Sequence, residues 1–120
     1  AMALRGDTLF VADFHNGILA LRVSADSNIA EIGRLATADS ARDVLSTGDH
    51  LFVAQGAQGV LIVDTSDASM MEAVGHHESR APAVRLTGHE ESHVLVSADS
   101  GGMEVLEVTD PVNPRLIFPG

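Results

Sequence analysis

The chain has 120 residues, with 7 basic against 17 acidic side chains and a formal net charge of −10. This acidity argues against nucleic acid, whose binding needs clustered Lys and Arg, and equally against an anionic membrane surface. The absence of cysteine excludes a disulfide scaffold, thiolate catalysis and cysteine-ligated metals. No run approaches the ~18 apolar residues of a membrane span and no charged-then-apolar leader opens the chain, so we expect no membrane insertion and leave the compartment open.

Short apolar runs bounded by Gly, Asp, Asn and Ser follow one another along the whole chain, and such runs predict β-strands. No window carries a helical period of useful length. Met70–Val74 could form one helical turn, but the matching segments favour a strand. In chain order, the predicted strands are Met2–Leu4, Leu9–Ala12, Ile18–Val23, Ile29–Leu35, Arg42–Ser46, Leu51–Ala54, Val60–Asp64, Met70–Val74, Ala83–Thr87, Val94–Ala98, Met103–Val108 and Arg115–Phe118.

These strands repeat as a group. The segment 9–13 recurs at 51–55, 42 residues later, and more loosely at 95–99, after a further 44. Each copy leads to a glycine (Gly17, Gly59, Gly102) and then to a second apolar run. A period of ~40 residues with four strands per unit is typical of a propeller blade. We therefore predict an all-β fold of three blades with four antiparallel strands each, in one unit over residues 1–120, with blades of approximately 1–38, 39–79 and 80–120.

The middle unit also supports a family resemblance. Its segment Val60-Leu61-Ile62-Val63-Asp64 closely resembles the Leu-Val-Ile-Val-Asp (LVIVD) propeller repeat. Segments 41–44 and 108–114 resemble it too, and Arg22 and Glu107 replace the Asp in the outer units. The resemblance covers essentially the whole chain. It implies a β-propeller, usually without an assigned activity, and favours an exported or cell-surface protein.

Three blades do not close a ring, because known closed propellers have about 4–8. The end blades carry apolar residues and no polar cap, and a repeat cannot bury its hydrophobic face alone. Two alternatives remain: a piece of a longer propeller, or two copies that meet head to tail as a six-bladed homodimer. We favour the homodimer because the ends of the chain fall near blade boundaries.

Candidate site residues lie on one expected face. In a propeller the loops between the second and third strands share a face with the loops that link blades, and ligands usually bind there. The candidates on this face are Asp13, His15, Asn16, Gln55, Gln58 and Asp99 from the first kind of loop, and Asp39, His76 and His77 from the second. Arg42 and Asp43 on an inner strand complete the set, although this pair favours a tie between strands over a ligand contact.

Imidazole and carboxylate together can ligate zinc, nickel or copper, so His76, His77 and Glu78 are weak metal candidates. Adjacent strand residues point to opposite sides, so both histidines could ligate one ion only from a loop. A solvated loop explains the cluster as well. We therefore predict no metal and no cofactor.

Two functions stay open. The first is a non-enzymatic binding or scaffold protein, half of a six-bladed propeller, with a small-molecule or protein ligand that the sequence does not identify. The alternative is a hydrolase or lyase with a His/Asp site at the channel face of the assembled ring. A lectin-like sugar binder is disfavoured because the chain has no Trp or Tyr as a stacking platform.

Overall fold

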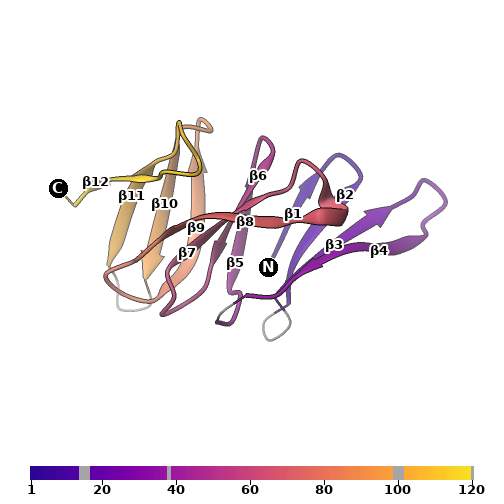
Figure 1. Ribbon diagram of the computed structural model, residues 1–120, viewed down its shortest axis with the longest axis horizontal. Helices are drawn as coiled ribbons and strands as arrows, with labels where there is room; N and C mark the ends of the chain where they lie inside the picture. Colours follow the sequence, from indigo (N-terminus) through magenta and orange to yellow (C-terminus); the bar gives the residue numbers. More distant parts are fainter. Residues whose placement is uncertain (14–16, 38, 99–101, 120) are drawn as a thin grey trace.

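In the computed structural model, which describes residues 1–13, 17–37, 39–98 and 102–119, twelve strands form three antiparallel sheets. Each sheet has its four strands in chain order, and the sheets lie side by side along the long axis (Figure 1). We call them blades 1, 2 and 3. Blade 1 holds β1 (Met2–Arg5), β2 (Thr8–Asp13), β3 (Gly17–Val23) and β4 (Ile29–Leu35); blade 2 holds β5 (Asp43–Thr47), β6 (His50–Ala54), β7 (Val60–Asp64) and β8 (Glu72–His77); blade 3 holds β9 (Ala83–His89), β10 (His93–Ala98), β11 (Met103–Glu107) and β12 (Arg115–Phe118).

The structure confirms the all-β fold with blades of four antiparallel strands. Among the described residues the only helical element is the 3-10 turn η1 (Ala68–Met70). No helix in these residues has the length and apolar character needed to cross a membrane. The three blades together measure 48 × 27 × 21 Å.

The fourth strand of blade 2 departs most from its predicted position. We expected it at 70–74, but β8 covers Glu72–His77 and follows η1. Asp67 caps η1, because its Oδ1 accepts from Ser69 Oγ at 2.6 Å and Ser69 N at 3.0 Å. These bonds from Ser69 hold the pKa of Asp67 below its ordinary value. The cap keeps 68–70 in a turn, and the strand therefore begins only at Glu72 and continues to His77. His76 and His77, which we expected in a loop, lie on this strand.

The middle blade is buried on both faces. We call the face toward the following blade the front face and the face toward the preceding blade the rear face. On β6, Leu51 and Val53 are fully buried in the cluster with blade 1, whereas Phe52 and Ala54 are fully buried in the cluster with blade 3. Because side chains alternate along a strand, both faces of β6 must be apolar.

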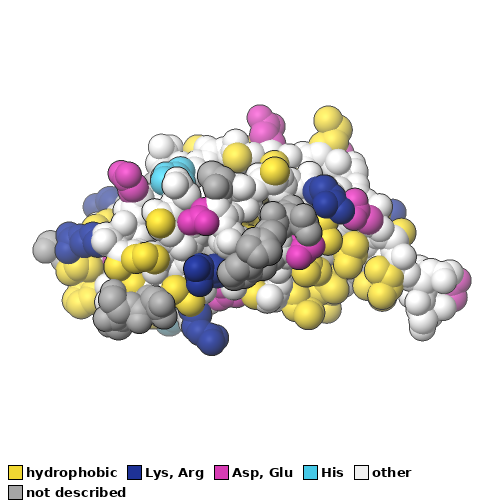
Figure 2. Space-filling view, turned by 90° about the horizontal axis from the view of Figure 1, so that it is seen from below, with side chains coloured by type: hydrophobic (Ala, Val, Ile, Leu, Met, Phe, Trp, Pro, Cys, Tyr) yellow, Lys and Arg dark blue, Asp and Glu magenta, His cyan; other side chains and the backbone are white. Residues whose placement is uncertain are grey.

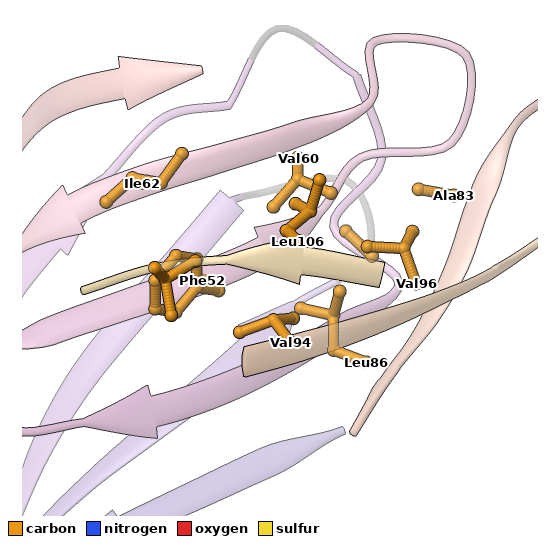
Figure 3. Packing of buried hydrophobic residues seen from close by; sticks show 10 residues of the cluster. Phe52, Val60, Ile62, Ala83, Leu86, Val94, Val96 and Leu106 are labelled. Carbon is orange, nitrogen blue, oxygen red and sulfur yellow. The ribbon is translucent and has the colours of Figure 1, made fainter. Parts of the chain in front are cut away.

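The cluster between blades 2 and 3 shows how two faces meet. In Figure 3, Phe52 and Val60 of the front face of blade 2 lie against Val94 and Leu106 of the rear face of blade 3. All four side chains are 0% exposed. Burial of each such side chain stabilises the fold by about 1.5–3 kcal/mol. Blades 2 and 3 are therefore held together mainly by their apolar faces.

Strand β10 of blade 3 is offset by one residue from the alignment that we expected. The sequence match places Leu95 with Leu51, but in the structure Val94 takes the position of Leu51 on the rear face. The turn before β10 has three residues, 90–92, where the turn before β6 has two, 48–49. Since a shift of one residue exchanges the two faces of a strand, only the contacts between blades reveal this offset.

Candidate functional site

The first candidate site lies at the inner edge of the molecule, where β5 runs beside both β1 and β9. Here a hollow of about 230 Å³ is lined by Ala1, Arg42, Asp43, Val84 and Arg85. The sequence predicted Arg42 and Asp43 but missed Arg85. The signal for Arg85 was a charged residue between the apolar Val84 and Leu86 of the inner strand.

Asp43 joins two blades at this edge. Its Oδ2 accepts from the backbone N–H of Leu86 on β9 at 2.8 Å, and its Oδ1 accepts from the N–H of Val44 at 2.9 Å. Each oxygen of this carboxylate thus accepts a hydrogen bond from a backbone amide, and such charge-assisted bonds are stronger than neutral ones. Asp43 therefore serves as a structural tie between blades 2 and 3.

Replacing Asp43 with alanine should lower the free energy of unfolding by about 1–3 kcal/mol, because the Leu86 N–H loses its acceptor. Asp43→Asn keeps one acceptor oxygen and should lose less. Urea unfolding followed by circular dichroism measures both variants. Equal stability of wild type and Asp43→Ala would contradict the role of this bond.

The turn between β6 and β7 packs inward. Gly56 pairs with Ala83 of β9, and a Cβ on Gly56 would lie 3.1 Å from Arg42 Nε and 3.4 Å from Asp39 Oδ2. Gln55 is 2% exposed, so it is a core residue and is not open to a ligand. Gln58 is exposed, and its carbonyl meets His76 Nε2. This turn therefore joins blade 2 to blade 3 through Gly56 and Ala83 and lies against the link between blades 1 and 2 at Asp39 and Arg42.

The predicted metal candidates diverge. His76 lies against the Gln58 carbonyl, whereas His77 Nε2 lies 3.0 Å from Glu104 Oε1 of blade 3. The two histidines are neighbours on β8 and point to opposite faces. Glu78 follows the strand and is exposed. Within the described part of the chain, no three His, Asp or Glu side chains are grouped so that they could hold a metal ion.

Asp13 is the last residue of β2. Its charge contributes to a raised pKa of Arg34, for which the main cause is the hydrogen bond and charge of Glu31. The remaining candidates, His15, Asn16 and Asp99, lie outside the described residues.

A second hollow, which the sequence did not predict, lies where the link between blades 2 and 3 runs along blade 3. It has a volume of about 230 Å³, and its polar lining comes from Ser79, Arg80 and Glu104. Glu104 is 7% exposed although it carries a carboxylate. The signal in the sequence was a single Glu inside the apolar run 103–106.

Comparison with known families decides the identity of the repeat. The LVIVD repeat model matches twice, over residues 1–37 and 38–78, which contain blades 1 and 2. The chain belongs to the LVIVD-repeat family. No curated protein matches the chain.

The structure explains the LVIVD motif physically. In this family member the motif is β7 itself, in which Val60 and Ile62 pack toward blade 3 while Leu61 and Val63 pack toward blade 1. The closing Asp64 accepts from the N–H of Ser66 at 2.9 Å and from its hydroxyl at 2.8 Å. These bonds lower the pKa of Asp64. The motif thus encodes a strand with two apolar faces followed by a turn.

Thr65, directly after the motif, anchors blade 1. Arg5 of β1 donates to Thr65 Oγ1 at 2.7 Å and also to the Thr65 carbonyl, while Thr65 Oγ1 donates to the Asp49 carbonyl at 2.9 Å. Arg5 also covers the ring of Phe10, 5.1 Å from its centroid. Arg5 therefore ties β1 of blade 1 to the residue that directly follows the LVIVD strand.

Proposed function

We propose that this LVIVD-repeat protein is a non-enzymatic binding or scaffold protein and that two copies close head to tail into a six-bladed ring. The proposal is carried by two apolar faces, one on each outer blade, that no described residue covers. Figure 2 shows hydrophobic side chains gathered toward both ends of the long axis. A large exposed apolar surface marks an interaction site.

The rear face of blade 1 is built to pack on a preceding blade. By strand register, its Met2, Leu9, Val11, Leu19 and Leu21 occupy the positions of Val44, Leu51, Val53, Leu61 and Val63 in blade 2. In blade 2 these side chains pack against blade 1. In blade 1, Met2 is 66% exposed, and the other four side chains are half-buried where their counterparts in blade 2 are covered by a neighbouring blade.

The front face of blade 3 is the matching half. Leu95, Met103 and Val105 take the positions of Phe52, Val60 and Ile62, which are fully buried in blade 2. In blade 3, Met103 is 43% exposed. A single chain therefore presents one unpaired front face and one unpaired rear face, which is the arrangement that a head-to-tail dimer with two equivalent seams requires.

Two departures from the repeat favour a second copy as the occupant. At both internal interfaces a glycine of the outer strand, Gly33 or Gly75, lies against a loop of the next blade, at Ala68 or Val112. Blade 3 has Phe118 at this position, and it is 52% exposed. Blade 1 has a regular β3–β4 hairpin, with Val23 paired to Ile29, in place of the packed loop.

These departures complement each other. Where an internal interface has a glycine and a packed loop, the proposed seam has a large aromatic side chain and a flat hairpin. Val23 and Ile29 are on the rear face of that hairpin, 36% and 65% exposed. Phe118 of one copy would therefore cover Val23 and Ile29 of its partner, which is a contact that only these two outer blades can make.

The mass of the chain in solution tests this proposal. We expect light scattering to give twice the 12.5 kDa chain mass at micromolar concentration. A stable single-chain mass would overturn the proposal and would assign the open faces to further blades of a longer polypeptide. The contacts of Asp43, Gln55, His76 and His77 are structural ties, which favours a binding function over a hydrolase or lyase.

A further inference from the structure

One position of the inner strands differs in charge from blade to blade. By strand register, Ala1, Asp43 and Arg85 occupy the same position in blades 1, 2 and 3. All three residues line the hollow at the inner edge of the molecule. A guanidinium in blade 3 thus stands where blade 2 has a carboxylate.

The Asp43 carboxylate shows what this position does between two blades. It accepts from the N–H of Val44 in its own blade and from the N–H of Leu86 in the next blade. Both amides belong to inner strands, which are the open edges of their sheets. An N–H group that points out of such an edge has no partner in the ladder and needs another acceptor. Asp43 supplies that acceptor to both blades.

Blade 1 presents an amide of the same kind. Met2 occupies the register position of Val44 and Leu86. The N–H of Ala12 donates to the carbonyl of Ala1, and hydrogen-bonded pairs alternate along an antiparallel ladder. The Met2 N–H therefore points away from β2, toward the inner edge.

At the proposed seam, two donors would meet at this edge. Arg85 of one copy would face the Met2 N–H of its partner, as Asp43 faces the Leu86 N–H inside the chain. A guanidinium has five N–H donors and no acceptor, so Arg85 cannot bind this amide. None of the ion pairs among the described residues includes Arg85. The seam therefore has a cation and an amide where the internal interface has a carboxylate.

We propose that each seam binds a small carboxylate at its inner edge, in the place that the Asp43 carboxylate takes between blades 2 and 3. One oxygen would accept from the Met2 N–H of one copy and the other from the Arg85 guanidinium of the other copy. This inference rests on the proposed ring, because a single chain holds only half of the site. The rest of the ligand would lie in the hollow, whose volume of about 230 Å³ is several times that of one water molecule.

A carboxylate is the ligand that matches the charges of this hollow. Its five lining residues include two guanidiniums, Arg42 and Arg85, against one carboxylate, Asp43. The oxygens of that carboxylate already accept from backbone amides. An ammonium ligand would be repelled by Arg85, and a neutral ligand would leave the guanidinium without a counter-charge.

Sedimentation equilibrium in sodium acetate and in sodium chloride, at equal pH and ionic strength, tests the site. A ligand that binds only the dimer stabilises it by mass action, so we expect the dissociation constant of the dimer to fall by about tenfold or more in acetate. Acetamide, the neutral analogue of acetate, should have no effect. Equal dissociation constants in acetate and chloride would overturn this inference and leave the ring standing. A single-chain mass in both solutions would overturn the ring and, with it, this inference.

The repeat itself supplies the decisive variant. Arg85→Asp restores the residue of blade 2, so it should accept from the partner's Met2 N–H directly, keep the dimer in chloride and lose the response to acetate. Arg85→Gln removes the cation and should lose the response as well. Arg34→Gln is the matched control, because it removes the same charge from the outer strand β4 and should keep the response. An acetate response that persists in both variants of Arg85 would overturn the assignment.

The single-chain variant Phe118→Glu shows whether the site needs both copies. Its Arg85 has no partner amide, so its melting temperature should be the same in acetate and chloride, whereas that of wild type should be higher in acetate. An equal rise in wild type and in Phe118→Glu would place the acetate site within one chain and would overturn the inference.

Discussion

If two copies form the proposed ring, replacing Phe118 with glutamate should convert that dimer into single chains. Phe118 is 52% exposed in the single chain, and in the proposed ring it would cover Val23 and Ile29 of the partner copy. Loss of one buried aromatic side chain costs about 1.5–3 kcal/mol, and two equivalent seams double this cost. The dissociation constant of the dimer should therefore rise by about 10²- to 10⁴-fold. Sedimentation equilibrium measures the change.

A charge-exchange pair tests the head-to-tail geometry directly. Ile29→Lys should dissociate the dimer for the same reason as Phe118→Glu. When the two variants are mixed, one seam of the mixed dimer pairs Glu at 118 with Lys at 29, and the other seam is wild type. The mixture should therefore recover the dimer mass, although each variant alone is monomeric. A head-to-head dimer would not recover in this way.

Met70→Glu is the matched control. Met70 is 75% exposed on η1 of the middle blade, away from both open faces. This variant should keep the mass of wild type. If it dissociates the dimer as much as Phe118→Glu does, or if the mixture of Phe118→Glu and Ile29→Lys stays monomeric, the seam is not the one described.

The second large effect concerns Gly33. A Cβ at this position would lie 2.0 Å from the Ala68 carbonyl oxygen and 3.2 Å from Ser69 Cα. Both contacts are backbone atoms of the neighbouring blade, so no side-chain rotation can relieve them. Gly33→Ala must move blades 1 and 2 apart at their outer edge, and we expect a loss of about 2–4 kcal/mol in the free energy of unfolding.

Gly102→Ala serves as the control for this change, since a Cβ there would meet no described heavy atom within 4 Å. It should alter stability by less than about 0.5 kcal/mol. Both variants are compared in urea at equal protein concentration, because an associating protein gains stability with concentration. If Gly33→Ala is as stable as Gly102→Ala, the packing of β4 against η1 is looser than the structure describes.

The sequence by itself determined the kind of fold. Strand alternation, turn glycines and a repeat of 42 residues act over short distances, so they predict four-stranded blades without reference to tertiary contacts. The motif 60–64 also identified the family, because a strand buried on both faces has an almost unbroken apolar run. The local misprediction came at η1, where the Asp67 cap overrides the strand pattern.

Only the tertiary structure decided the site. His77 and Glu104 are 27 residues apart, and they meet because the front face of blade 2 packs on the rear face of blade 3. Arg85 joins Arg42 at the inner edge for a similar reason. The offset of β10 decides which of its residues face blade 2, and a sequence alignment that is wrong by one residue exchanges its two faces. Polar partners between blades depend on that choice of face, which local sequence patterns leave open.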